Sequence, residues 1–142
     1  MKRIFICLAL FFAASSLFAQ FSVHLNYSGA TKAGMGIGYD FNNKLWGDLT
    51  FSRAFVAAYN ISDISTDFSV NYNIVPIKRH DMYLGAGVLM DLYWGDILFT
   101  LPIGLLIRPF EKLNNMAFQT EIRLATDGGV YLFGNLGIRY RF

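Results

Sequence analysis

Apolar and polar residues alternate one by one along most of the chain from Phe21 onward. In the first stretch, for example, Val23 and Leu25 alternate with Ser22 and His24. A period of two residues is typical of β-strands, whose successive side chains point to opposite faces. Apolar residues spaced three and four apart, which would indicate a helix, are almost absent. The pattern predicts strands and no helix, over residues 21–27, 34–41, 45–52, 67–74, 82–91, 97–108, 116–124 and 130–142.

The length of the chain agrees with eight strands that cross a membrane. Such a strand takes roughly 10 residues, so eight strands use about 80 of the about 123 residues from Gln20 onward. The remainder gives seven connections of about 6 residues each, which is a usual length. Ten strands would leave about 2 or 3 residues per connection, and six would need about 12. An even number of strands also returns both ends of the chain to the same side.

The residues on the two faces of the strands indicate which face lies outward. The polar face is rich in Gly, Ser, Asn and Thr, its acidic residues are nearly balanced by arginines, and it carries no lysine in a strand core. A surface in water normally mixes Lys and Glu. Aromatic residues on the apolar face gather near the strand ends, as they do at the two interfaces of a membrane. We therefore predict an all-β fold, a closed antiparallel up-and-down transmembrane β-barrel with a polar, plugged lumen. A secreted lipocalin-like barrel is the alternative.

The charged residues of the polar face are expected to form one network inside the barrel. An eight-stranded barrel has an interior only just wide enough for side chains, and a charge held there needs a partner. Glu121 and Arg139 lie on the last two strands, which are neighbours, so we expect these two to pair. The predicted lumen charge network comprises Glu121, Arg139, Arg123, Asp48, Arg108 and His24. A packed and paired interior predicts no continuous path for water.

The connections differ between the two ends of the predicted barrel. Residues 42–44, 76–81 and 109–115 hold turn formers and most lysines of the chain after residue 20, and we assign them to the periplasmic side. The opposite connections fall at 28–32, 54–65, 93–96 and 125–129. The 54–65 loop is the longest, and an extracellular partner could contact it. Pro102 stands in mid-strand, where a closed barrel needs an N–H donor, so we expect a bulge or a misassigned strand there.

The first nineteen residues form a separate unit. Lys2 and Arg3 precede an apolar run over 4–14, and small residues lead to Ala19, which is the pattern of a signal peptide cleaved after that residue. The apolar run is shorter than the roughly 20 residues that a membrane-spanning helix needs. The predicted organisation is therefore a signal peptide over 1–19 and a barrel domain over 20–142. Cys7, the single cysteine, falls in the first unit, so the barrel contains neither a disulfide nor a cysteine-based zinc site.

Composition and charge exclude two further classes of protein. With 54% hydrophobic and 15% charged residues, the chain is too apolar to be disordered. The formal net charge of +2 comes from Lys2 and Arg3, and the rest of the chain has as many acidic as basic residues. Nucleic acid is therefore not an expected partner.

The last eight residues carry the pattern of a known assembly signal. Asn135, Gly137, Tyr140 and the terminal Phe142 follow the order polar, glycine, aromatic, terminal aromatic, as at the end of bacterial outer-membrane barrels. With the signal peptide and the strand count, the chain resembles the small eight-stranded OmpA/OmpX-type barrels, including the porin-like barrel domains of Bacteroidetes. This resemblance implies the outer membrane of a Gram-negative bacterium. It also implies contact with outer-membrane lipids and lipopolysaccharide, and with the barrel-assembly machinery through the C-terminal signal.

The resemblance also raises a catalytic alternative, because some membrane barrels are lipid A deacylases or palmitoyltransferases. Those enzymes need a histidine with a serine and an acid near the outer rim. His24 is expected inside the lumen near the periplasmic end and His80 in a periplasmic turn, so neither suits that role. Two histidines without paired spacing also make a metal site improbable. We expect a structural or surface-interaction role with no catalytic site, cofactor or metal, and keep a narrow diffusion pore and a lipid A-modifying enzyme as alternatives.

Overall fold

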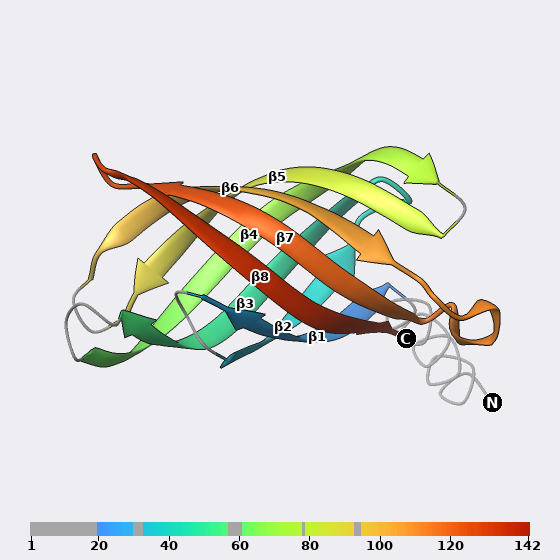
Figure 1. Cartoon of the computed structure of the whole chain (residues 1–142), viewed down its shortest axis with the longest axis horizontal. Coiled ribbons are helices and arrows are strands. Elements are labelled where there is room, and N and C mark those ends of the chain that lie inside the picture. The colour runs from blue at the N-terminus through green and yellow to red at the C-terminus, as the bar shows by residue number, and fades with distance from the viewer. Residues whose placement is uncertain (1–19, 30–32, 57–60, 78, 93–94) are drawn as a thin grey trace, which may run out of the picture.

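The computed structural model describes residues 20–29, 33–56, 61–77, 79–92 and 95–142. They form one closed barrel in which each strand is antiparallel to both neighbours, in the order of the chain (Figure 1). The predicted eight-stranded fold is thereby confirmed, whereas the signal peptide over 1–19 lies outside the described residues. The strands are β1 (Phe21–Ser28), β2 (Ala33–Asp40), β3 (Leu45–Val56), β4 (Ile61–Ile77), β5 (His80–Asp91), β6 (Ile97–Ile107), β7 (Met116–Thr126) and β8 (Val130–Arg141).

The strands are strongly staggered around the barrel. A path along directly paired residues that begins at Arg141 returns to β8 at Tyr131, ten residues away. The residues between them on this path are Ser22, Gly38, Asp48, Ser69, Gly87, Thr100 and Ala125. Stagger and strand number together set the tilt and the radius of a barrel. With eight strands, the interior has room for side chains and little else.

Apolar side chains cover the outside of the barrel, and polar side chains fill the inside. On β1, Leu25 is 62% exposed while its neighbour His24 is 5% exposed. The same alternation places Asp48 and Thr50 of β3 in the interior. This is the reverse of a protein in water, and it confirms the predicted orientation of the two faces. A lipocalin-like barrel would have its apolar face inside.

The β3–β4 hairpin is longer than predicted. The two strands pair as far as Val56 and Ile61, so the loop expected over 54–65 is wrong in extent. Only residues 57–60 connect the strands, and they lie outside the described residues. Several apolar residues follow one another directly from Ala54, so the period of two that would have indicated a strand is lost there.

Pro102 lies within β6, which runs through it from Ile97 to Ile107. The expected bulge is wrong: the pairs Leu84–Ile103 and Gly87–Thr100 keep one register with β5, and no pair is formed between them. Proline has no N–H group to donate, so the ladder is interrupted at this point without a shift. The strand itself was assigned correctly.

The register shift of the barrel lies instead in β4, between Asn73 and Val75. Beyond it β4 continues to Ile77 and β5 begins at His80, so His80 lies on a strand where a turn was predicted. A short 3₁₀ helix over Glu111–Leu113 interrupts the connection from β6 to β7, which the prediction of no helix missed. Among the described residues, no helix is long and apolar enough to cross a membrane.

The orientation of the two faces can be tested by introducing an arginine on the outer face at two depths and comparing the loss in the free energy of unfolding. Ile122 is 57% exposed in the middle of β7, and Val130 is 80% exposed at the start of β8. In lipid vesicles, Ile122→Arg should lower the free energy of unfolding by about 2 to 4 kcal/mol, and Val130→Arg by about 0 to 1 kcal/mol. Urea unfolding of the inserted protein measures both. Equal costs at the two positions would contradict a bilayer around the outer face.

Candidate functional site

A buried carboxylate, Glu121 of β7, is the centre of one group of lumen side chains. Its Oε1 accepts hydrogen bonds from Arg123 Nε at 2.9 Å and from the Asn135 amide at 2.8 Å. Its Oε2 accepts a hydrogen bond from the Tyr83 hydroxyl at 2.7 Å, and Gln119 donates to that hydroxyl at 2.7 Å. Both carboxylate oxygens of Glu121 are therefore satisfied by side chains of three strands.

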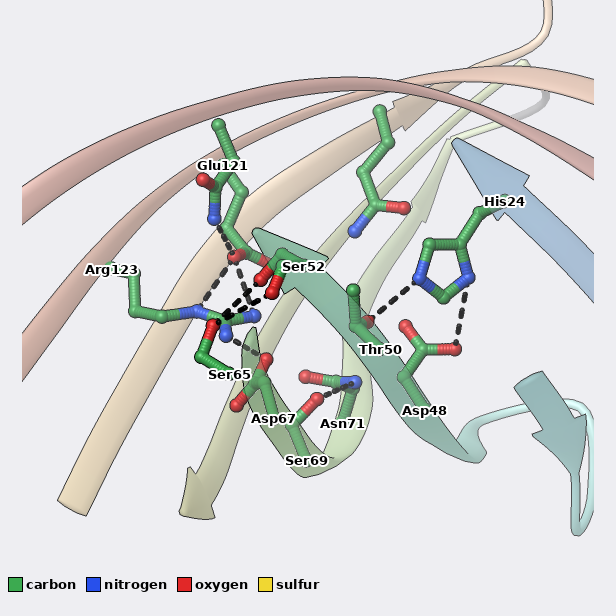
Figure 2. Close-up of polar contacts among 12 residues, drawn as sticks. His24, Asp48, Thr50, Ser52, Ser65, Asp67, Ser69, Asn71, Glu121 and Arg123 are labelled. Atoms are coloured by element: carbon green, nitrogen blue, oxygen red, sulfur yellow. Dashed lines mark hydrogen bonds and ion pairs between the residues drawn. The ribbon is translucent and has the colours of Figure 1, made fainter. Parts of the chain in front are cut away.

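Arg123 joins this group to the opposite wall of the barrel. Its Nη2 lies 2.8 Å from Glu121 Oε1, and its Nη1 forms an ion pair with Asp67 Oδ2 of β4 (Figure 2). The guanidinium thus lies between two carboxylates that come from strands far apart in the sequence. Asp67 was not among the predicted network residues.

A second group lies around Asp48 of β3. Arg139 of β8 forms an ion pair with Asp48 Oδ2, and His24 Nδ1 of β1 lies 3.7 Å from Asp48 Oδ1. The other ring nitrogen of His24 lies 2.8 Å from the Thr50 hydroxyl oxygen. The Arg139 guanidinium lies over the Trp46 ring, with 4.0 Å between Cζ and the ring centroid, which is within cation–π distance.

An apolar cluster fills the lumen beside these charges. Trp46 and Tyr83 are almost completely buried and meet edge to face, with 5.0 Å between ring centroids. Leu106 and Ala117 belong to the same cluster. The Trp46 indole donates to Asn73 at 3.1 Å, so its polar atom is also satisfied. Together with Arg139, these side chains form a layer across the barrel.

Glycines on the inward face make room for the rings. A Cβ atom at Gly36 would lie 2.4 Å from His24 Nε2, and one at Gly104 would lie 2.5 Å from the Tyr83 ring. Both distances are shorter than real Cβ contacts, so any larger residue would displace a lumen side chain.

The predicted pairing of Glu121 with Arg139 is wrong. Although β7 and β8 are neighbours, Glu121 lies opposite Asn135, and Arg139 lies opposite Ala117. The two positions are displaced by four residues, which is about 13 Å along a strand, and Arg139 pairs with Asp48 of β3. Glu121 binds Arg123 of its own strand instead.

The other predicted network residues fall in different places. His24 and Asp48 come together with Arg139, as described above. Arg108 lies apart from both groups, at the end of the barrel where β1 begins, and pairs with Asp81 at 2.6 Å. Sequence reasoning missed the partners Asp67 and Trp46 because contacts across a lumen depend on the stagger, which an alternating pattern does not reveal.

The end of the barrel that carries Arg108 has further polar contacts. Arg141 pairs with Asp40 at 2.7 Å, and both line a cavity of about 140 Å³ together with Gln20, Asn42 and Asn43. Its lining is polar and open to solvent on the rim. The residues that line this cavity include no member of the predicted lumen charge network.

Asp48, His24 and Thr50 lie in the order of an acid, a base and a hydroxyl nucleophile. All three are buried, and the His24 ring packs against Gly36, so the hydroxyl is shielded from bulk solvent. His80 is exposed at the start of β5, away from this group. In the described part of the chain, no three His, Cys, Asp or Glu side chains are grouped so that they could hold a metal ion.

The chain matches no protein-family model and no curated protein by sequence. Solved structures share its fold. The N-terminal β-barrel domain of Pseudomonas aeruginosa OprF is 13% identical, covers 86% of this chain and 96% of its own, and has a TM-score of 0.67. Neisserial surface protein A (NspA) is 18% identical, covers 86% and 94%, and has a TM-score of 0.56. A de novo designed transmembrane β-barrel is 18% identical, covers 86% and 92%, and has a TM-score of 0.58. The resemblance to small membrane barrels is thereby confirmed for the fold.

The observed pairing can be tested by double-mutant cycles. Glu121→Gln combined with Arg123→Gln should give a coupling energy of about 1 to 3 kcal/mol, because the two side chains are in direct contact. Glu121→Gln combined with Arg139→Gln should give a much smaller value. The free energy of unfolding of the four proteins in each cycle provides the measurement. A larger coupling to Arg139 than to Arg123 would favour the pairing expected from sequence.

Proposed function

We propose that this chain is an integral outer-membrane protein of a Gram-negative bacterium, exported by a signal peptide over 1–19. The apolar outer face supports this, since a closed barrel with such a surface is stable only in hydrocarbon. Two of the similar structures also support this proposal. NspA is described as a surface protein, and the designed protein is described as a transmembrane β-barrel.

We further propose a structural or surface-interaction role without conduction. The observation that carries it is the layer of Trp46, Tyr83, Leu106, Ala117 and Arg139 across the lumen. The layer lies where the barrel is only wide enough for side chains. Within it, the Trp46 indole donates to Asn73 and Arg139 pairs with Asp48. Such a layer blocks ions and solutes, so the barrel acts as an anchor that presents its extracellular connections.

Single-channel recording in planar bilayers tests the closed lumen. The purified barrel should show no stable ohmic steps, because the layer leaves no continuous water path. Trp46→Ala combined with Tyr83→Ala should produce such steps, whereas Phe51→Ala, which removes an outward-facing ring, should not. Reproducible steps from the unchanged protein would favour the narrow diffusion pore.

We also propose that the barrel has no enzymatic activity. The buried Asp48–His24–Thr50 group is the one arrangement among the described residues that favours the lipid A-modifying alternative. Labelling of Thr50 by a fluorophosphonate probe, together with altered lipid A masses in cells that express the protein, would support that alternative. An extracellular partner for residues 54–65 stays a prediction, now for a hairpin that replaces the expected loop.

Assembly through the C-terminal signal is part of the same proposal. Tyr140 and Phe142 are exposed on the outer face, with their rings edge to face and 5.4 Å between centroids. The Asn135 side chain and Gly137, by contrast, face the interior, where Asn135 binds Glu121. The two rings are therefore free to be recognised from outside before the barrel inserts.

Replacing Tyr140 and Phe142 by Ser should leave secretion intact and abolish the folded, heat-modifiable form in the outer membrane. The reason is that the change removes the recognised rings and leaves the lumen unchanged. Phe99→Ser is the matched control, because it removes an exposed aromatic ring from β6 outside the signal. Cell fractionation with gel-shift analysis measures the outcome. Normal levels of the folded double variant would contradict recognition of the terminal rings.

A further inference from the structure

Gln20 lies just before β1 and is held against β2 at two points. Its backbone carbonyl accepts a hydrogen bond from the Asp40 N–H at 2.9 Å, which continues the ladder between β1 and β2 by one residue. Its side-chain oxygen Oε1 accepts a hydrogen bond from the Tyr39 hydroxyl. The residue is exposed and lines the open polar cavity with Asp40 and Arg141. The fold therefore fixes the position of Gln20 and leaves it accessible to solvent.

The Tyr39 ring is itself fixed by its neighbours. It meets the rings of Phe21 and Phe41 edge to face, with 5.1 and 5.3 Å between ring centroids. A ring packed on two sides keeps its hydroxyl in one place. The hydrogen bond from Tyr39 to Gln20 Oε1 is therefore preorganised by the barrel.

Gln20 would also be the first residue of the exported chain, a step that rests on the proposed signal peptide over 1–19. Cleavage after Ala19 gives Gln20 a free α-amino group. Such a group titrates at about pH 8, so part of it is the neutral, nucleophilic amine in a neutral compartment. The amine and the side-chain amide then belong to the same residue, so their reaction is intramolecular.

We propose that Gln20 cyclises to an N-terminal pyroglutamate, and that Tyr39 assists this reaction on the folded barrel. The α-amino nitrogen attacks Cδ of the side-chain amide, and the bond from Cδ to Nε2 breaks. Nε2 takes up the proton that the amine loses and leaves as ammonia. Negative charge develops on Oε1 during the attack, and the Tyr39 hydroxyl donates to that atom. The reaction is a single event on the chain's own end, without turnover of a substrate.

The product protects the strand at which the barrel closes. Pyroglutamate has no free α-amino group, so an aminopeptidase cannot begin to remove residues from this end. The residues that follow Gln20 join β1 to the end of the chain: the Phe21 carbonyl accepts from the Phe142 N–H at 3.0 Å, and Ser22 pairs with Arg141. Cyclisation therefore preserves the pairing of β1 with β8.

Mass spectrometry of the N-terminal peptide tests the modification, on protein isolated from the membranes of cells that express the full chain. The peptide should begin at residue 20, be lighter than its sequence by one ammonia molecule, and resist labelling by amine reagents. Gln20→Ala is the control, because its N-terminus cannot cyclise and should be labelled. An unmodified, labelled Gln20 would overturn the inference and leave the signal peptide intact. A peptide that begins at another residue would overturn the proposed cleavage site, and the inference with it.

The part played by Tyr39 is measured on the barrel folded in detergent micelles, directly after a site-specific protease removes a leader that ends before Gln20. The loss of ammonia is followed over time by intact mass. Tyr39→Phe keeps the ring and removes the donor, so it should slow the reaction roughly tenfold. Tyr140→Phe is the matched control, because its ring lies on the outer face against Phe142, and it should leave the rate unchanged. Equal rates for Tyr39→Phe and the unchanged protein would overturn the assistance by Tyr39.

Discussion

The seam between β1 and β8 is the interaction on which the rest of the molecule depends. Seven residue pairs join the strands, from Ser22–Arg141 to Ser28–Asn135. Without them, two strand edges would present unpaired N–H and C=O groups to hydrocarbon, at several kcal/mol for each group. Once the seam is closed with this stagger, the radius is set, and with it the narrow lumen that every inward side chain must share.

Within that lumen, the ion pairs act across the barrel more than along its wall. Arg123 connects β7 to β4, and Arg139 connects β8 to β3. Each pair joins strands that share no backbone hydrogen bonds, so it resists flattening of the cross-section. Removing one partner of such a pair leaves a buried charge and costs about 3 to 5 kcal/mol. The interior therefore helps to hold the shape that the seam first defines.

The strands and their faces could be predicted from the sequence, because the period of two is a local property. The contacts inside could be predicted only in part. Asp48, His24 and Arg139 do meet, but the partner of Glu121 depends on how far β8 is displaced along β7. The 54–65 segment was misassigned because its consecutive apolar residues hide the alternation. The first error concerns long-range register, which the hydrophobic pattern does not encode, whereas the second arises where the local pattern itself is lost.

The unequal length of the strands has a consequence for the surrounding lipids. β1 and β2 have 8 residues each, whereas β3 has 12 and β4 has 17. At the usual tilt, eight residues rise roughly 19 Å, which is less than the apolar band of about 25 Å in such barrels. In a bilayer, the acyl chains beside β1 and β2 must therefore shorten, while those beside β3 and β4 need not. The barrel would thus thin the membrane on one side only and gather lipids of different length around its circumference.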